Sequence, residues 1–516
     1  MNRTHFYVSI MLGYIILSMI AGCSKEESKV ISSTSVAGSP IEIQEIDLPT
    51  SDWGVPLESL SYNHGIGDLN GDGEMDFVIV AWEEYNFKHN YYAYAFLSDG
   101  SFLWSLNLKS RYKEKMGFEP CAVVALCVWD MNGDGKDEVI TNIGDDLVIV
   151  DGLSGKIEKR VKLSSPSKFI CSAIACLDGK NPYIVVAFGK DAQILAFDGE
   201  LNLYWRFAQE KYRDAINMRL YVWDIDNDGR DEVALGPVLL NEDGTLYYGA
   251  FTGIACRSFI HDIDPGNPGY EWYLPMSMVE GYGSEEMLKP NPESGPYLID
   301  VDQKIILWRY GGNPDKQSGW SGRLHRGWIA DYDVNIPGLE MWLTGVYWEG
   351  NEYSRYREGE FADSKQRANM IKWARFRERD FIYSAKGEIL HQLNHQVAYP
   401  VQWDDDPDYE LYFYRQGFIA DNFSGPTLVM GLPQAFNSGE SVEADIRGDY
   451  REEIIVASRD KLYIVSNAAP GSYPDRPSPR AGHNYMMNIA RSGSGLPKPQ
   501  PPDPDYDVFE GKNKIE

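Results

Sequence analysis

The stretch that decides the fold is residues 68–76, Asp-Leu-Asn-Gly-Asp-Gly-Glu-Met-Asp, which leads directly into the apolar run Phe77-Val-Ile-Val. Carboxylate or amide oxygens occupy positions 1, 3, 5 and 9 of this stretch. Position 7 offers a backbone carbonyl, and the glycine at position 6 permits a sharp turn. Oxygen-only ligands at this spacing are typical of calcium loops. The stretch therefore predicts an acidic loop that opens a β-strand.

The same unit recurs along the whole chain. Residues 130–138 and 224–232 repeat the full pattern, again before apolar runs. Degraded copies begin at Cys176, Asp262, Asp331, Asp404 and Asp445, so that successive copies start 38 to 73 residues apart. That spacing is typical of propeller blades with variable loops, and one four-stranded sheet cannot bury both of its faces unless it stacks on another.

We therefore predict an all-β fold, a single β-propeller over residues 52–516. Eight copies indicate eight blades, with seven as the alternative. Residues 351–380, rich in Arg and Glu, are expected to form an inserted helical excursion on the rim.

The three full loops are the candidate metal sites, with Ca²⁺ as the expected ion. The alternative is a turn held only by side-chain to backbone hydrogen bonds. In the eighth copy the cation Arg447 stands at position 3, so no metal is expected there. The predicted ligands, with a backbone carbonyl at position 7, are Asp68, Asn70, Asp72, Glu74 and Asp76, then Asp130, Asn132, Asp134, Lys136 and Glu138, and then Asp224, Asp226, Asp228, Arg230 and Glu232.

Composition excludes several classes of function. The 516 residues carry 48 Lys and Arg against 77 Asp and Glu, a net charge of −29, which opposes binding to nucleic acid or to an anionic membrane surface. No phosphate-binding loop, zinc-type Cys/His spacing or Gly-x-Ser-x-Gly elbow occurs, so nucleotide and serine-hydrolase chemistry have no support.

The N-terminus indicates export. Residues 1–22 combine a basic start with a short apolar stretch, and Ile20-Ala-Gly-Cys23 resembles the lipobox of bacterial lipoproteins. Ser24-Lys-Glu-Glu27 resembles the surface-export signal of Bacteroidota lipoproteins, and residues 23–51 are interpreted as a flexible tether. We expect a protein held in the bacterial outer membrane by a lipid on Cys23, cell-surface exposed. An ordinary signal peptide with a chance cysteine is the alternative.

The remaining cysteines, Cys121, Cys127, Cys171, Cys176 and Cys256, are expected to be mostly buried thiols, and the sequence assigns no disulfide.

The repeats resemble the FG-GAP type, and an ordered set of segments is similar to the propeller of the family-11 polysaccharide lyases, the rhamnogalacturonan lyases. The resemblance implies an eight-bladed propeller and a carbon–oxygen lyase that cleaves an anionic polysaccharide of rhamnose and uronic acid, rhamnogalacturonan or ulvan, by β-elimination. We expect the protein to be a monomer. A more distant resemblance is to the propeller-fold ulvan lyases. The matching segments are residues 67–73, 176–180, 262–266, 326–331 with 337–342, 399–404 and 444–453.

Two places depart from that family. Where it carries an Asn-His-Asn and a Gly-His-Gly-Asp, this chain has Asn217-Met218-Arg219 and Gly253-Ile254-Ala255. Because the first repeat follows almost directly after the presumed tether, we expect the small N-terminal β-domain of the family to be absent. Two functions stay open: a lyase, and a non-catalytic surface glycan-binding protein with a lyase-derived propeller.

A lyase for uronic-acid polysaccharides needs a base, a group that neutralises the carboxylate, and an acid for the leaving oxygen. His64 and His89, which flank the first loop, are the candidates for base or neutraliser, and ordinary core or surface histidines are the alternative. Arg206 and Arg326 are candidates for neutralisation, and Tyr92 for the acid. Tryptophans beside the repeats are expected in the blade core, with sugar stacking as the alternative: Trp82, Trp129, Trp223, Trp328, Trp342 and Trp403.

Overall fold

The structure is a computed structural model in which every regular element of the described residues is a β-strand. Among these residues, no helix is long and apolar enough to cross a membrane. The described residues are 29–33, 41–49, 58–85, 88–112, 126–163, 169–188, 193–208, 220–249, 254–255, 258–277, 291–312, 318–349, 378–393, 399–404, 409–413, 418–420, 427–429, 441–458, 461–469, 506–507 and 512–513.

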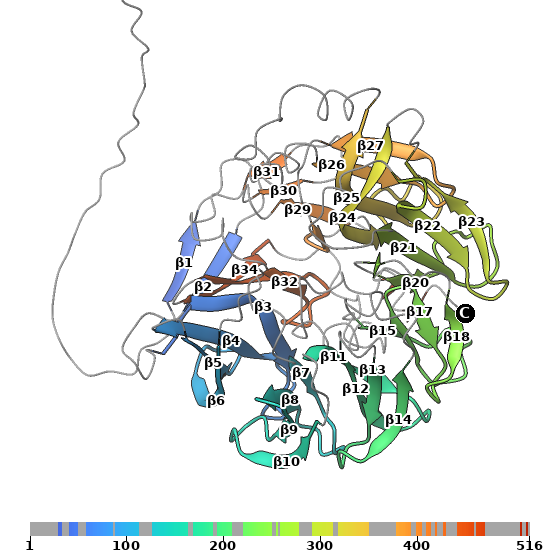
Figure 1. The fold of residues 1–516 in the computed structure, drawn as a ribbon. Helices are drawn as coiled ribbons and strands as arrows, with labels where there is room; N and C mark the ends of the chain where they lie inside the picture. The colour runs from blue at the N-terminus through green and yellow to red at the C-terminus, as the bar shows by residue number, and fades with distance from the viewer. Residues whose placement is uncertain are drawn as a thin grey trace, which may run out of the picture.

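The strands form eight antiparallel sheets that follow one another around a ring, numbered here as blades 1 to 8 (Figure 1). Blade 1 is β3 (Glu58–Gly67), β4 (Asp76–Tyr85), β5 (Lys88–Phe96) and β6 (Phe102–Tyr112). Blade 2 is β7 (Leu126–Trp129), β8 (Glu138–Ile143), β9 (Asp146–Val150) and β10 (Ile157–Lys162). Blade 3 is β11 (Phe169–Cys176), β12 (Pro182–Phe188), β13 (Gln193–Phe197) and β14 (Leu203–Ala208). Blade 4 is β15 (Leu220–Trp223), β16 (Glu232–Leu235), β17 (Val238–Leu240) and β18 (Leu246–Gly249).

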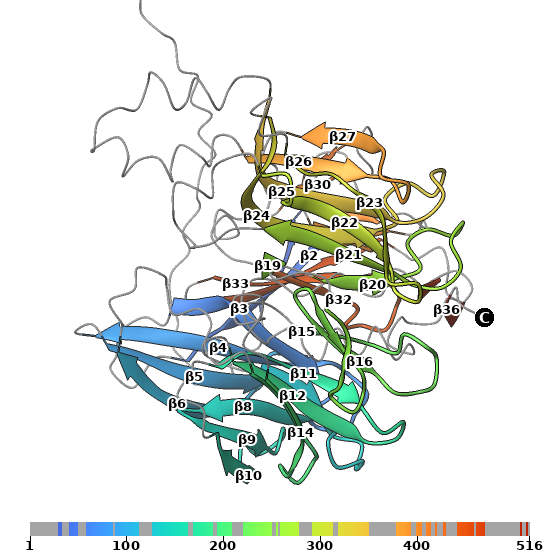
Figure 2. The same cartoon turned by 45° about the vertical axis from the view of Figure 1, so that its right-hand side comes forward.

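The second half of the ring repeats the arrangement (Figure 2). Blade 5 is β19 (Ile254–Ala255) and β20 (Phe259–His261), both paired with β21 (Glu271–Ser277), then β22 (Gly295–Asp300) and β23 (Ile305–Arg309). Blade 6 is β24 (Gly319–Ala330), β25 (Glu340–Trp348), β26 (Glu378–Tyr383) and β27 (Ile389–Leu393). Blade 7 is β28 (Tyr399–Val401), β29 (Glu410–Phe413), β30 (Phe418–Ala420) and β31 (Thr427–Val429). A separate ribbon pairs β35 (Tyr506–Asp507) with β36 (Lys512–Asn513).

Blade 8 joins the two ends of the chain. It contains β32 (Ser441–Ala444), β33 (Glu453–Ser458) and β34 (Lys461–Asn467), and its fourth strand is β2 (Ile41–Asp47), with β1 (Lys29–Ser33) beyond it. Strand β2 pairs antiparallel with β34 from Ile41 opposite Asn467 to Asp47 opposite Lys461. The prediction that residues 23–51 form a tether is therefore wrong for 41–47, because this segment completes the last sheet.

The first strand of each blade lies nearest the axis, since first strands of neighbouring blades contact one another: β3 with β7, β7 with β11, and β11 with β15. The core fills the spaces between blades. One cluster joins Phe77 and Ile79 of blade 1 to Val442 and Ile455 of blade 8, and the others likewise combine adjacent sheets. Each sheet therefore buries both faces against its neighbours, as the stacking argument requires.

The tryptophans confirm this arrangement. Trp223, Trp328, Trp342 and Trp403 are at most 1% exposed, so they belong to the core and are not sugar platforms. Trp129 is partly buried, and the side chain of Trp82 lies outside the described residues. Cys127 and Cys171 are buried thiols outside any disulfide, as expected; Cys176 is half-buried, and Cys23, Cys121 and Cys256 lie outside the described residues.

All eight acidic repeats connect the first strand of a blade to the second. Because the blades run in the same direction, the eight loops lie on one face of the ring, called here the acidic-loop face. The seventh copy, placed at Asp404 by the sequence, begins structurally at Gln402. Of the expected helical excursion at 351–380, residues 351–377 lie outside the described residues, and 378–380 are strand β26 instead.

Candidate functional site

Seven of the eight loops share one internal contact. The Asp or Glu that begins the second strand, called here the closing carboxylate, accepts a hydrogen bond of 2.7 to 3.0 Å from the backbone N–H of the second loop residue. The closing carboxylates are at most 4% exposed. They are Asp76, Glu138, Glu232, Glu271, Glu340, Glu410 and Glu453.

Burial makes these carboxyl groups hard to ionise. It raises the pKa of Asp76 to about 6 and that of Glu138 to about 7, and the acidic neighbours of each group push in the same direction. The pKa of Glu232, Glu340 and Glu453 rises to about 8 for the same leading reason. A cation at the loop would relieve this cost, because an opposite charge favours the ionised form.

The first residue of each full loop organises the turn. Asp68 accepts hydrogen bonds from the backbone N–H of Gly71 at 2.7 Å and of Gly73 at 2.8 Å. Asp130 and Asp224 bond the equivalent residues, Gly135 and Gly229, at 2.9 Å. The glycines at position 6 have φ values of 84 to 91°, the left-handed region that the sequence pattern predicted. The turn chemistry is confirmed, and it is compatible with a bound cation and with a turn alone.

The loop of blade 4 fits a cation best. Single oxygen atoms from Asp224, Asp226 and Glu232 lie within 4.8 Å of one another, and these are the only three acidic or histidine groups so arranged within the described parts of the chain. In blades 1 and 2 an asparagine replaces the acid at position 3. The Asn70 amide donates to Asp72 at 2.8 Å, and the Asn132 amide to Glu138 at 2.8 Å. These two loops thus offer fewer converging carboxylates.

The residues at position 7 of the three full loops, Glu74, Lys136 and Arg230, have exposed side chains. The backbone N–H of Glu74 donates to Asp72, that of Lys136 to Asp134, and that of Arg230 to Asp228, each at 2.8 to 2.9 Å. The Arg230 side chain pairs with Glu242 at 3.3 Å. Lys136 and Arg230 are therefore relevant to a cation only through their backbone carbonyls, as the pattern proposed.

The structure does not gather the five predicted catalytic residues. His64 is 2% exposed on β3, the axial strand of blade 1, and Arg326 is on β24, the axial strand of blade 6. His89 is on β5, the third strand of blade 1, at the end away from the acidic loops.

Two of the five are poorly placed for an axial site. Tyr92 lies on β5, the third strand of blade 1, and packs inside the apolar cluster between blades 1 and 8, which contradicts its role as an acid in an axial site. Arg206 is exposed on β14, the outermost strand of blade 3, where it cannot share an axial site with His64.

Buried polar residues near Arg326 escaped the sequence analysis. The carboxylate of Asp380, fully buried on β26, accepts from the Trp342 indole at 3.2 Å and from the Thr344 hydroxyl. Thr344 lies opposite Arg326 in the sheet. No sequence signal marked Asp380, because it falls at the end of the presumed helical excursion.

A buried histidine was missed too. His261, 1% exposed, lies with its Nε2 2.9 Å from the Tyr221 hydroxyl and its ring 4.3 Å from that of Trp223. Its place directly before the acidic repeat that begins at Asp262 is a signal that could have found it.

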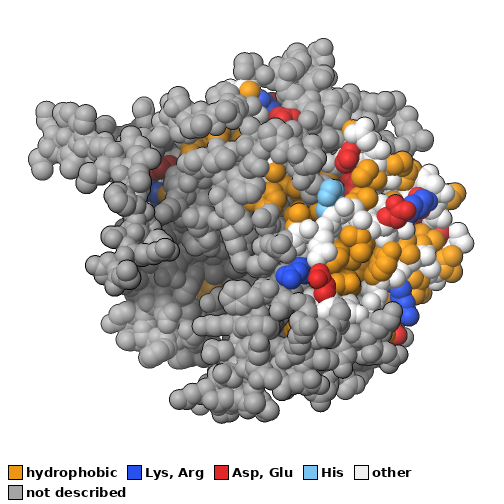
Figure 3. Space-filling model, turned by 90° about the horizontal axis from the view of Figure 1, so that it is seen from above, with side chains coloured by type: hydrophobic (Ala, Val, Ile, Leu, Met, Phe, Trp, Pro, Cys, Tyr) orange, Lys and Arg blue, Asp and Glu red, His pale blue; other side chains and the backbone are white. Residues whose placement is uncertain are grey.

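On the outer surface, the described residues expose apolar side chains more than clusters of charge. Figure 3 looks down on the side of the ring where β23 and β27 lie and shows hydrophobic side chains with single charged groups between them. Ile305, Ile306, Tyr310 and Ile389 are each 41 to 49% exposed there. The described residues of this side form no cationic patch of the kind that an anionic polymer would bind.

Comparison with known proteins identifies relatives of this chain. A family model described as rhamnogalacturonan lyase family 11, C-terminal domain, matches residues 166–514. The rhamnogalacturonan exolyase YesX of Bacillus subtilis is 24% identical over 81% of this chain and 73% of its own. The rhamnogalacturonan endolyase YesW of the same species is 23% identical over 89% and 75%.

Solved structures show the same fold. The exotype lyase YesX has a TM-score of 0.66 at 20% identity, covering 92% of this chain and 83% of its own. YesW has a TM-score of 0.65 at 20% identity, covering 95% and 83%. A Bacillus licheniformis rhamnogalacturonan lyase has a TM-score of 0.64 at 19% identity, covering 92% and 82%. The family model covers the chain from the end of blade 2 onwards, which is more than half of the sequence. The chain therefore belongs to rhamnogalacturonan lyase family 11.

Proposed function

We propose that this protein is a polysaccharide lyase that cleaves rhamnogalacturonan by β-elimination. The observation that carries the proposal is the family match over residues 166–514, on a chain that forms eight blades. The two curated relatives are named an exolyase and an endolyase at nearly equal identity, so the mode of cleavage is left to experiment.

The reaction determines what the site must supply. A base removes the C5 proton of the uronate, the C4–O bond breaks, a C4=C5 double bond forms, and an acid protonates the departing oxygen. A cationic group beside the uronate carboxylate stabilises the negative charge that develops during proton removal. An axial position suits these groups because the first strands of several blades converge there.

His64 and Arg326 are the residues that we propose for this site. Both lie on axial strands, one in blade 1 and one in blade 6. His64 would act as base, and Arg326, whose side chain lies outside the described residues, would neutralise the uronate carboxylate. His89 remains a candidate from the opposite end of blade 1. The roles first considered for Tyr92 and Arg206 are not proposed again, because neither residue lies at the axis.

A second function is favoured by one specific observation. Met218 and Ile254 stand where the resemblance places two family histidines. A propeller that keeps its frame but loses these groups is expected of a surface protein that binds the glycan without cleaving it. Loss of chemistry and retention of fold are compatible, because function lives in the site rather than in the fold.

The deciding experiment measures unsaturated uronate by its absorbance at about 235 nm. Purified protein is incubated with rhamnogalacturonan, ulvan and polygalacturonate at constant calcium. A signal on rhamnogalacturonan supports the lyase, and a signal on ulvan alone moves the substrate to the algal polymer. No signal on any polymer, together with retardation in a gel containing rhamnogalacturonan, supports the binding protein.

Variants then locate the site. Removing a base where proton transfer is the slow step lowers turnover by roughly 10² or more. We expect this for His64→Ala, and His391→Ala on the outer strand β27 is the matched control. Turnover that survives both His64→Ala and His89→Ala excludes a histidine base in blade 1. Melting temperatures separate lost chemistry from lost folding, since His64 is buried.

Calcium and a lipid anchor complete the proposal. In the loops that begin at Asp68, Asp130 and Asp224, the predicted oxygen ligands would hold Ca²⁺, whose charge would neutralise the buried carboxylates and secure each turn. Converging carboxylates in the blade 4 loop support this.

Cys23, outside the described residues, would carry the lipid in the outer membrane. A Cys23→Ser variant that is released from the membrane fraction supports the lipid anchor. A variant that stays membrane-bound contradicts it.

A further inference from the structure

The loop of blade 8 keeps the acidic turn but not the acidic third position. Asp445 accepts hydrogen bonds from the backbone N–H of Gly448 at 2.6 Å and of Tyr450 at 3.2 Å, as Asp68 and Asp130 do from the equivalent positions of their loops. Glu453 closes the loop by accepting from Ile446 at 3.0 Å. Position 3 is Arg447, which supplies a cation where loop 4 supplies a carboxylate. The frame is therefore that of the loops for which we propose calcium, with a side chain that does not fit a metal.

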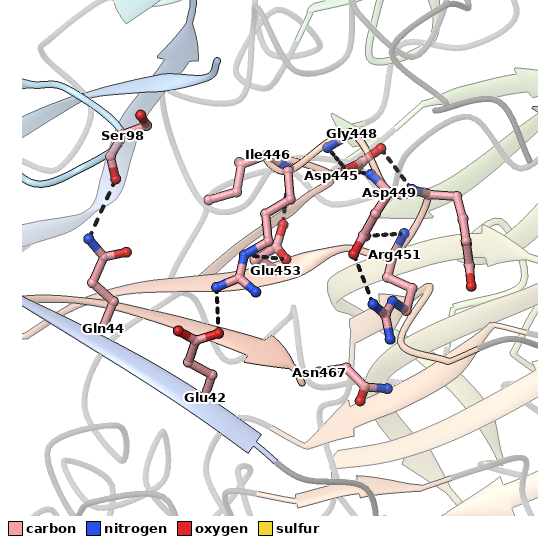
Figure 4. Close-up of polar contacts among 12 residues, drawn as sticks. Glu42, Gln44, Ser98, Asp445, Ile446, Gly448, Asp449, Arg451, Glu453 and Asn467 are labelled. Carbon is pink, nitrogen blue, oxygen red and sulfur yellow. Dashed lines mark hydrogen bonds and ion pairs between the residues drawn. The ribbon is translucent and has the colours of Figure 1, made fainter. Parts of the chain in front are cut away.

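The guanidinium of Arg447 lies between two carboxylates from different parts of the chain, those of Glu42 and Glu453, both of which Figure 4 labels. Its Nε is 3.5 Å from Oε1 of Glu453, whose side chain is 3% exposed. Its Nη2 is 3.0 Å from Oε2 of Glu42 on β2. The first contact places positive charge beside a buried closing carboxylate, and the second reaches the strand that closes the ring.

In a second loop a cation from a neighbouring blade pairs with the acidic third position. In blade 5 the third-position acid is Asp264, 6% exposed, and Nζ of Lys386 in blade 6 lies 2.5 Å from its Oδ2. Lys386 follows β26 in the turn before β27. Two loops of the acidic-loop face thus hold a protein cation, supplied by the loop itself in blade 8 and by the next blade in blade 5.

Strand β2 depends on ion pairs with blade 8 at both of its ends. Glu42 near its start pairs with Arg447. At its other end Lys461 of β34 lies 2.7 Å from Glu45 and 3.3 Å from Asp47. The N-terminal strand of a protein with net charge −29 brings three acidic residues to the ring, and the cations on blade 8 offset their charge there.

We propose that Arg447 is the resident cation of the blade 8 loop, standing in place of a metal, and that it ties the N-terminal strand β2 to the ring through Glu42. Closure of the propeller is then independent of calcium and sensitive to salt, whether or not the other loops hold calcium. The inference concerns the closing blade alone and does not require lyase activity.

Hydrogen exchange of the full-length protein tests the proposal. We compare the amides of residues 41–47 with those of 138–143, which follow the loop of blade 2. Arg447→Met is expected to raise the exchange rate of 41–47 at least tenfold, and Glu42→Gln to raise it in the same direction. Arg447→Lys should restore part of the protection. Arg230→Met, which removes an arginine from the blade 4 loop without touching β2, is the matched control.

A second test of the proposal adds chelator or salt during hydrogen exchange. In wild type, chelation should leave residues 41–47 protected, while 1 M salt, where the screening length is about 3 Å, should weaken that protection. The proposal is overturned if chelation alone deprotects 41–47, or if Arg447→Met exchanges like wild type. Should Arg447→Met fail to fold, Glu42→Gln decides on the same readout.

A gain of metal binding gives the third arm. Tyr450 occupies position 6 with a φ of 72°, where the full loops have glycine. Arg447→Asp combined with Tyr450→Gly gives this loop the acidic and glycine positions of loop 4. Calorimetric titration should find one more Ca²⁺ per chain than in wild type. An unchanged number, in a variant that is folded, means that Arg447 does not occupy a cation position.

Discussion

At the scale of single residues, the acidic positions were readable from the sequence because their geometry is local. Positions 1 and 9 of a turn bond to backbone groups only a few residues away, as Asp68 and Asp76 do. The catalytic candidates were not readable in this way. Burial of Tyr92 and exposure of Arg206 depend on which blade covers which strand, and that is determined by contacts distant in sequence.

The buried closing carboxylate of blade 6 gives a pH prediction. Burial raises the pKa of Glu340 to about 8, with Asp331 and Asp333 adding to the effect. Its folded pKa exceeds the unfolded value, so its contribution to stability is full below about pH 4.5 and is lost as pH rises through about 8. We expect Glu340→Gln, which keeps an acceptor for the Tyr332 N–H, to gain on the order of 1 to 3 kcal/mol over wild type at pH 8.5 but little at pH 5.

Urea unfolding of both proteins at the two pH values measures this difference. Glu388→Gln, an exposed glutamate of the same blade, is the control and should not change with pH. An equal offset at pH 5 and pH 8.5 would mean that Glu340 does not titrate between them.

At the scale of elements, neighbouring blades are joined by a reciprocal contact between their loops. The backbone N–H of Asp68 donates to the carboxylate of Asp137 at 2.7 Å, and the N–H of Asp137 donates to the carbonyl of Asp68 at 2.8 Å. The same pair of bonds joins Cys176 to Asp231 and Gln402 to Glu452. The acid just before the closing carboxylate therefore has a connecting function, which the ligand interpretation of the repeat did not assign.

Removal of this contact should weaken the junction of blades 1 and 2. Asp137→Ala leaves the partly buried Asp68 N–H without its acceptor, which costs on the order of 1 kcal/mol. Asp137→Asn keeps an oxygen at that place and should cost less. Chemical denaturation gives both values at fixed pH, and equal losses in the two variants would show that the carboxylate's charge, not its hydrogen bond, matters.

Calcium removal belongs to the same scale. If the loops of blades 1, 2 and 4 hold Ca²⁺, chelation leaves like charges facing one another and removes a ligand of the folded state, so the melting temperature should fall. Asp226→Asn should reduce that fall, because it removes one of the three converging carboxylates of blade 4. Asp264→Asn, in a loop that already holds Lys386, is the control. A melting temperature that chelator leaves unchanged contradicts calcium at all three loops.

Strand β2 shows where prediction of elements failed. Ile41-Glu-Ile-Gln alternates apolar and polar residues, and the structure buries Ile41 and Ile43 in the core. The period of two was present in the sequence. The partner strand, β34, lies at the other end of the chain, so the short segment beside a serine-rich stretch was interpreted as tether.

At the scale of the whole molecule, the number of blades could be predicted because each blade repeats one loop, and eight loops counted along the sequence become eight sheets in the ring. Closure of the ring could not be predicted, since it depends on a single non-local pairing. Blade 8 has only three strands from the C-terminal part of the chain, and β2 supplies the fourth. The N-terminal segment is thus part of the fold rather than a spacer in front of it.

Truncation tests this dependence directly. A chain that begins at residue 36 keeps β2 and should melt close to the full-length protein. A chain that begins at residue 49 loses Ile41, Ile43, Ile46 and Leu48, each at most 8% exposed in the intact ring. Burial of one such side chain is worth about 1.5 to 3 kcal/mol, so removal of all four should cost several kcal/mol and expose the edge of β34.

We expect the shorter chain to melt well below the longer one and to self-associate, as seen by light scattering after gel filtration. Ile43→Asp in the full-length chain is the companion variant, because it disrupts the same packing without shortening the protein. If the chain that begins at residue 49 stays monomeric and keeps its melting temperature, the ring closes through blade 8 alone, and β2 only covers an edge that is already stable.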